Sequence, residues 1–289
     1  MTLIKDKLQN IKLELIELGV CEGDNLFIVA DFIRLGYFRV NGLLSAQDVL
    51  QVLLEIIGPN GNIITPSYTE TDYIWGRELP HFDVNNVPPN NAFAQAIFSL
   101  SEKQNVVRSK HPTNSYIAIG PMATDLVGWH NEKYLAYAPM VLLKGMNFKN
   151  LLLAMGEDES KGLSVLHAAQ EYLGMSTKNY LSGLLAAKYK SSEGKTVVYR
   201  RKSVGGCTLG GKKAVGYLIN KTKSKVSKTG RGLSILVEWD YAFNWHVEML
   251  KNDRGYFKCH DKACKSCHGS RGYSKRFIFF WLKWIVNIL

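Results

Sequence analysis

Hydrophobic positions in the first part of the chain alternate between a helical and a strand period. Residues 3–18 carry apolar side chains three or four positions apart, which predicts an amphipathic helix. An apolar run at 26–32 predicts a buried strand, 45–58 predicts a helix between a serine N-cap and a glycine stop, and 62–66 predicts a second strand. This alternation of helix and strand is typical of an α/β fold.

The stretch 67–91 has no period and mixes prolines, aromatic residues and polar residues, so we expect a long loop of the kind that builds sites. Further elements are expected at 91–101 (helix), 115–121 (strand), from Met122 (helix), 150–156 (strand), around His167 (helix), 195–200 (strand) and 233–239 (strand). We divide the chain into an α/β core (1–190), a basic α/β continuation of the core (191–250) and a cysteine-rich C-terminal tail (251–289).

The chain of 289 residues has a formal charge of +11, and ten basic residues with no acidic one lie between Arg200 and Arg231. Such a surface attracts polyanions or anionic small molecules, and it is equally consistent with a solvated basic face. A nucleic-acid surface would interleave stacking aromatic side chains with the charges. Tyr217 is the only aromatic residue between those two arginines, so the sequence argues against a nucleic-acid partner.

One histidine interrupts an otherwise apolar helical turn in GLSVLHAAQEYLG, residues 162–174. Gln170 and Glu171 follow His167 by three and four positions, so either side chain can face it on a helix. The group is consistent with a general base beyond the carboxyl end of a strand, where open α/β sheets bind ligands. It is also consistent with a core histidine, and the residues alone leave both interpretations open.

A second polar stretch, RSKHPTNSYIAIGP at 108–121, is typical of a loop that enters a buried strand, because proline pushes the preceding residue into extended geometry. Its polar side chains either meet a ligand or cap the turn. They are Arg108, Ser109, His111 and Ser115.

Six sequence blocks are VADFIRLG (29–36), GPNGNIITPSYT (58–69), FDVNNVPPN (82–90), RSKHPTNSYIAIGP (108–121), APMVLL (138–143) and LHAAQE (166–171). Their order and spacing resemble the aminoglycoside 3-N-acetyltransferase, or antibiotic N-acetyltransferase, family. The resemblance covers about residues 20–175. It implies a mixed sheet flanked by helices, and transfer of an acyl group from acyl-CoA, usually acetyl-CoA, to the amine of an amino sugar.

The resemblance also assigns roles to residues: His167 matches the base, Asp83 the acidic residue of the acceptor loop, and block 108–121 the coenzyme end. The catalytic set that it implies is His167, Asp83, Gln170 and Glu171. The coenzyme-binding set that it implies is Asp31, Arg108, His111 and Ser115.

Two departures from the family pattern change the expected acceptor. The family's glutamate falls on Gln170, which can orient His167 but cannot stabilise its cation. The family's His-Ser-Ser turn falls on Val29, Ala30 and Asp31, which lack its hydroxyl donors. With the charge of +11, these departures favour an anionic, nucleotide-linked amino sugar for surface polysaccharide over a polycationic aminoglycoside. An aminoglycoside, as in antibiotic resistance, is the alternative.

The tail places Cys259, Cys264 and Cys267 in a C-x4-C-x2-C spacing. Three clustered thiols favour a structural zinc site, although reduced cysteines on a surface loop would give the same spacing. We expect Cys207 as the fourth ligand, because it lies beside two glycines and because a histidine next to a ligating cysteine would chelate with strain.

The last residues, 277–289, are nearly all apolar but too few to span a bilayer. We expect them to dock on the core or on another subunit, with peripheral contact to the inner face of a membrane as the alternative. The first residues lack a signal-peptide pattern. The protein is therefore expected in the cytoplasm. We also expect a homo-oligomer.

Overall fold

The computed structural model describes residues 2–35, 45–155, 164–176, 183–203, 208–218, 223–268 and 277–286. The helices are α1 (Thr2–Leu18), α2 (Ala46–Ile57), α3 (Ala92–Phe98), the π-helix η1 (Thr124–Gly128), α4 (Ala138–Leu142), α5 (Val165–Tyr172), α6 (Thr208–Leu218), α7 (Trp239–Asn252), α8 (Lys265–His268) and α9 (Phe277–Val286). The strands are β1 (Asn25–Ala30), β2 (Asn62–Pro66), β3 (Asp72–Tyr73), β4 (His81–Phe82), β5 (Val106–Arg108), β6 (Tyr116–Ile119), β7 (Phe148–Leu153), β8 (Leu185–Lys190), β9 (Thr196–Arg200), β10 (Ser224–Thr229) and β11 (Gly232–Glu238).

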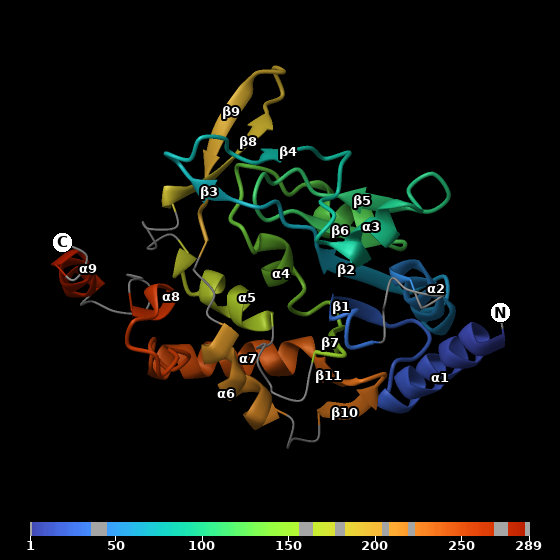
Figure 1. Cartoon of the computed structure of the whole chain (residues 1–289). Coiled ribbons are helices and arrows are strands. Elements are labelled where there is room, and N and C mark those ends of the chain that lie inside the picture. Colours follow the sequence, from blue (N-terminus) through green and yellow to red (C-terminus); the bar gives the residue numbers. More distant parts are fainter. Residues whose placement is uncertain are drawn as a thin grey trace.

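The core is a seven-stranded sheet in the order β10-β11-β7-β1-β2-β6-β5, visible at the centre of Figure 1. Strands β7, β1 and β2 are parallel, and the other neighbours are antiparallel. The expected mixed sheet flanked by helices is therefore confirmed.

Alternating side chains of the strands fill two separate cores, because successive residues of a strand point to opposite faces. Phe27 and Leu152 face the core that contains η1 and α4 to α7. Leu26, Ile28 and Leu151 face the core that contains α1, α2 and α3. The two faces are both covered, which explains why the strands are apolar without interruption.

The helix expected at 45–58 begins and ends as the sequence predicts. Ser45 and Asp48 form a reciprocal capping box, and Gly58 adopts a positive φ of 66° after the last turn. The element expected from Met122 is a short π-helix, η1. Strand β8, helices α4, α6 and α7, and the short strands were not expected from the sequence.

A smaller sheet is formed by β3, β8, β4 and β9 and lies at the top of Figure 1. Its strands β3 and β4 come from the expected long loop at 67–91. Strands β8 and β9 pair with each other although the boundary expected after residue 190 falls between them. Strands β10 and β11 of the basic continuation belong to the large sheet.

The parallel strands β1, β2 and β7 end at one edge of the large sheet, which we call the carboxyl edge. Antiparallel pairing brings the end of β5 and the start of β6 to this edge as well. Asp31, Ser67, Arg108, Ser115 and Ala154 therefore lie along it.

Helix α9 carries exposed apolar side chains, which are Ile278, Phe279, Leu282 and Val286. Within the described residues no helix is long and apolar enough to cross a membrane. Contact of 277–289 with a membrane surface or a second subunit stays a prediction.

The chain turns sharply at Ala154, which has a φ of 54°, a conformation that costs free energy for a residue other than glycine. A Cβ atom on Gly232 would lie 2.5 Å from the Ala154 carbonyl oxygen. Gly232→Ala should therefore lower the free energy of unfolding by about 1–3 kcal/mol, measured by chemical denaturation. Gly183→Ala, where a Cβ would meet nothing within 4 Å, is the control. Equal stability of the two variants would contradict the argument.

Candidate active site

His167 lies on α5 and is the polar, partly exposed position among buried neighbours on that helix. Its Nδ1 is 3.1 Å from Oε1 of Gln170, the residue one turn later. The ring stacks on Tyr137 with 4.8 Å between centroids and 11° between planes. An amide oxygen beside Nδ1 selects the tautomer with the proton on Nδ1, which leaves the lone pair on Nε2.

Glu171 does not face the His167 ring nitrogen. Its carboxylate accepts hydrogen bonds from the Tyr137 backbone N–H, at 2.9 and 3.1 Å, and from Oγ of Ser176 at 3.3 Å. Gln170 orients the histidine, and Glu171 fixes the backbone of the residue on which the histidine stacks. The two adjacent side chains therefore have different tasks, as expected for positions about 100° apart around a helix.

The electrostatic surroundings keep His167 neutral. Burial lowers its pKa, the Gln170 hydrogen bond opposes this shift, and the charge of Arg201 lowers the pKa further. The side chains of Arg201 and Ser203 also hydrogen-bond the Tyr137 side chain. A neutral imidazole is the form that accepts a proton, so the site suits a general base.

Arg108 is buried and hydrogen-bonds the backbone of the loop after β4. Its Nη1 donates to the carbonyl oxygens of Asp83 at 2.6 Å and Asn86 at 2.9 Å, and its Nη2 donates to Oγ of Ser115 at 3.2 Å. Ser115 in turn donates to the carbonyl oxygen of Ser67. Burial lowers the pKa of Arg108 to about 10. Arg108 and Ser115 thus tie the loop that contains Asp83 to the carboxyl edge.

His111 is fully buried and both of its ring nitrogens have protein partners. Nδ1 accepts from the backbone N–H groups of Thr113 at 3.3 Å and Asn114 at 3.0 Å, and Nε2 lies 3.1 Å from the Tyr199 hydroxyl. Its ring stacks on His130 at 4.6 Å. Burial, with the neighbouring His130, holds the pKa of His111 well below its ordinary value. This neutral pair links the 108–115 loop to β9.

Asp31 follows β1 at the carboxyl edge and caps the next turn. Oδ1 accepts from the backbone N–H groups of Ile33 at 3.1 Å and Arg34 at 3.3 Å, and Oδ2 forms an ion pair of 2.7 Å with Arg34. A carboxylate therefore replaces the hydroxyls that the family pattern has at this turn.

Asp83 is exposed and lines a cavity of about 720 Å³ rather than contacting His167. The cavity lies between the loop after β4, residues 131–133, and the turn from β8 to β9. The charged residues that line it are two acidic ones, Asp83 and Glu132, and three basic ones, Lys110, Lys133 and Lys190. The structure thus places Asp83 apart from the pair of His167 and Gln170.

The predicted zinc ligands are brought together in part. The sulfur atoms of Cys259, Cys264 and Cys267 lie within 4.8 Å of one another, whereas Cys207 falls outside the described residues.

Sequence reasoning missed Tyr137, Arg201, Ser203 and Ser176 as members of the His167 environment. Tyr137 directly precedes the block at 138–143, which was a usable signal. Ser176 contacts Glu171 from only five residues further along the chain, whereas Arg201 and Ser203 reach the site through tertiary folding.

The raised pKa of Glu171 makes the stability of the protein depend on pH in a way that can be measured. Burial raises its pKa to about 7, against the hydrogen bonds from Tyr137 and Ser176. Native Glu171 therefore retains, between its ordinary pKa of 4.5 and about 7, a proton that the unfolded chain releases, and stability falls as pH rises through this window. Glu171→Gln should raise the melting temperature at about pH 8 and change it little at about pH 5, in thermal unfolding experiments. Glu193→Gln, on the exposed turn between β8 and β9, should alter neither. A Glu171→Gln variant that is destabilised equally at both pH values would overturn this assignment.

Comparison with known proteins agrees with these features. The family model for aminoglycoside 3-N-acetyltransferase matches residues 30–251. Aminoglycoside N(3)-acetyltransferase IX of Micromonospora chalcea is 24% identical over 187 residues, which are 60% of this chain and 64% of that protein. The match thus spans slightly less than two thirds of that relative's length.

Solved structures of the family share the fold. The apoenzyme of aminoglycoside acetyltransferase AAC(3)-IVa superposes with a TM-score of 0.71 at 20% identity, covering 92% of this chain and 97% of that one. The structure titled AAC-IIIb binary with CoASH superposes with a TM-score of 0.66 at 19% identity, covering 85% and 96%.

The family prediction from the six sequence blocks is confirmed. The relatives are N-acetyltransferases by name, and one of the solved structures contains CoASH. The aminoglycoside alternative fits the relatives better than the nucleotide-linked sugar. With a family model that matches most of its length, the chain belongs to the aminoglycoside 3-N-acetyltransferase family.

Proposed function

We propose that this protein transfers an acetyl group from acetyl-CoA to an amine of an aminoglycoside, with His167 as the general base. The observation that carries the proposal is the contact between His167 Nδ1 and Gln170 Oε1 on α5, which packs against α4 and α7. The names of the relatives support the acceptor class.

Acetyl transfer forms a carbon–nitrogen bond and breaks the carbon–sulfur bond of the thioester, and the attacking nitrogen must lose a proton. The lone pair on His167 Nε2 takes this proton, while the proton on Nδ1 stays hydrogen-bonded to Oε1 of Gln170. Stacking on Tyr137 holds the ring plane, so that Nε2 keeps its direction during the transfer. The proton leaves with the thiol product.

The residues at the carboxyl edge are proposed to bind the coenzyme that supplies the acetyl group. We propose that Asp31 and block 108–115 border the coenzyme, in line with the family resemblance. Arg108, His111 and Ser115 are engaged by protein atoms, so their side chains hold the backbone that faces the ligand. Asp83 lines the cavity beside them and is proposed to meet the acceptor.

A nucleotide-linked amino sugar is the second candidate acceptor. One observation favours it: the cavity next to Asp83 is walled by three lysines and two carboxylates and is therefore not the acidic site that a polycation needs. The chain's net charge of +11 acts in the same direction.

The test is acetyl transfer from acetyl-CoA to a panel of aminoglycosides and of nucleotide-linked amino sugars, followed by mass spectrometry. The expected result is one acetyl group on an aminoglycoside. Transfer only to nucleotide-linked sugars would replace the first candidate with the second, and no transfer to either class would refute both.

His167→Asn keeps a hydrogen-bond donor toward Gln170 but has no base, so turnover should fall about 10²- to 10⁴-fold while the melting temperature and coenzyme binding stay near wild type. Near-normal turnover would remove His167 as the base.

Gln170→Glu tests the orienting contact. A carboxylate at this position favours the imidazolium, so the pKa of His167 should rise and the acidic limb of the kcat/KM profile should move to higher pH. Above that limb, turnover should equal or exceed that of the wild type. The pH profiles of the two proteins, recorded side by side, measure this shift. An unshifted limb would mean that residue 170 does not contact the base in the working enzyme.

A further inference from the structure

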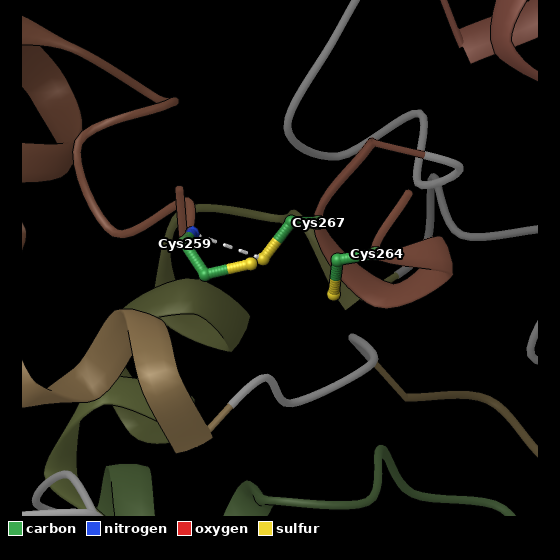
Figure 2. A group of neighbouring side chains, drawn as sticks. All are labelled: Cys259, Cys264 and Cys267. Atoms are coloured by element: carbon green, nitrogen blue, oxygen red, sulfur yellow. Dashed lines mark hydrogen bonds between the residues drawn. The ribbon is translucent and has the colours of Figure 1, made fainter. Parts of the chain in front are cut away.

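The strongest feature outside the candidate active site is the loop after α7, which gathers three thiols. Cys259 lies in the loop, and Cys264 and Cys267 lie at the start of α8 and within it. Their sulfur atoms all lie within 4.8 Å of one another. Figure 2 shows the three side chains. In a tetrahedral zinc site with Zn–S bonds of about 2.3 Å, neighbouring sulfurs are about 3.8 Å apart. The observed upper limit of 4.8 Å lies close to this spacing, so the three sulfurs are near enough to share one ion.

The thiols are held in a preorganised loop. The backbone N–H of Cys259 donates to the sulfur of Cys267 at 3.3 Å, the dashed line in Figure 2. The Cys264 N–H donates to the carbonyl oxygen of Asp261 at 3.2 Å, and the His268 N–H donates to the Cys264 carbonyl at 2.9 Å. An N–H donor aimed at sulfur stabilises the thiolate, which is the form that binds metal.

Burial gives the cluster a reason to bind metal. Cys259 is 7% exposed and Cys267 is fully buried, and the described cysteines form no disulfide. A thiolate without a counter-charge is costly in such a place. A divalent cation shared by the three sulfurs removes that cost and ties the loop to α8.

We propose that Cys259, Cys264 and Cys267 bind a structural Zn²⁺ ion. The three ligands come from residues 259–267 and take no part in the contacts of His167 and Gln170, so the proposal does not depend on the proposed function. Binding couples to the order of the tail, because the unfolded tail does not hold the ligands together.

The sequence keeps Cys207 as the candidate for the fourth ligand. Among the described residues no fourth histidine, cysteine or carboxylate joins the cluster. Cys207 precedes Gly210 by three residues, and Gly210 packs on the backbone of this loop: a Cβ there would lie 3.5 Å from the Cys259 nitrogen.

The test measures metal in protein purified without chelator and then dialysed against zinc-free buffer. About one zinc per chain is expected, with the three thiols protected from a thiol reagent until zinc is removed. Cys264→Ser should weaken zinc binding by more than the roughly 10- to 100-fold that loss of an outer-shell contact causes. Cys21→Ser, at an exposed cysteine outside the cluster, should leave the zinc content unchanged and is the matched control.

Cobalt substitution of the wild-type protein gives a readout that does not depend on how well a variant folds. A tetrahedral cobalt spectrum with sulfur-to-metal charge transfer supports the site, and a weaker charge-transfer band in Cys207→Ser would identify the fourth ligand. Absence of stoichiometric metal after purification in zinc-supplemented buffer, together with free titration of the three thiols or a disulfide between two of them, would sink the proposal.

Discussion

Strand β7 is buried between β1 and β11, and its end at the carboxyl edge is held from both sides. The parallel register with β1 pairs Leu153 with Ala30, so the two strands finish level with each other. The next residue, Ala154, takes a positive φ and donates its N–H to the Ser234 hydroxyl at 2.9 Å. Gly232 leaves room for this turn. Strain at that position is retained because strands on both sides fix the chain.

A group of buried polar side chains gives this edge its shape. Arg108, His111 and His130 are almost fully buried, and burying them is costly unless their hydrogen bonds are made. Arg108 ties down the loop after β4, and the two stacked histidines hold the 108–115 loop against β9. The pKa of His130 is lowered to about 4 by burial, so this pair stays neutral at physiological pH. The two histidines hold their loop without adding charge, whereas Arg108, with a pKa of about 10, stays positively charged.

The sequence predicts the elements whose signals are local. The helix at 45–58 follows from its serine cap and glycine stop, and the strand at 62–66 follows from its short apolar run. Strand β8 was missed because its sequence, LAAKYK, becomes a strand only by pairing with β3, β4 and β9. The contact of Gln170 with His167 was accessible from helical spacing, which allowed both Gln170 and Glu171 to face the ring. The choice between them, and the roles of Tyr137 and Arg201, depend on how α4, α5 and β9 pack.

The environment of His167 separates two tasks that a carboxylate beside a histidine performs together. Gln170 fixes the tautomer and the direction of Nε2, but as a neutral amide it supplies no charge to the imidazolium that forms on proton transfer. The carboxylate at the adjacent position, Glu171, has a pKa near 7 and is turned toward the Tyr137 backbone. The charge of Arg201 opposes protonation of the ring. His167 is thereby kept neutral at physiological pH, and a proton added to its ring would have only the neutral amide of Gln170, and no carboxylate, hydrogen-bonded to Nδ1.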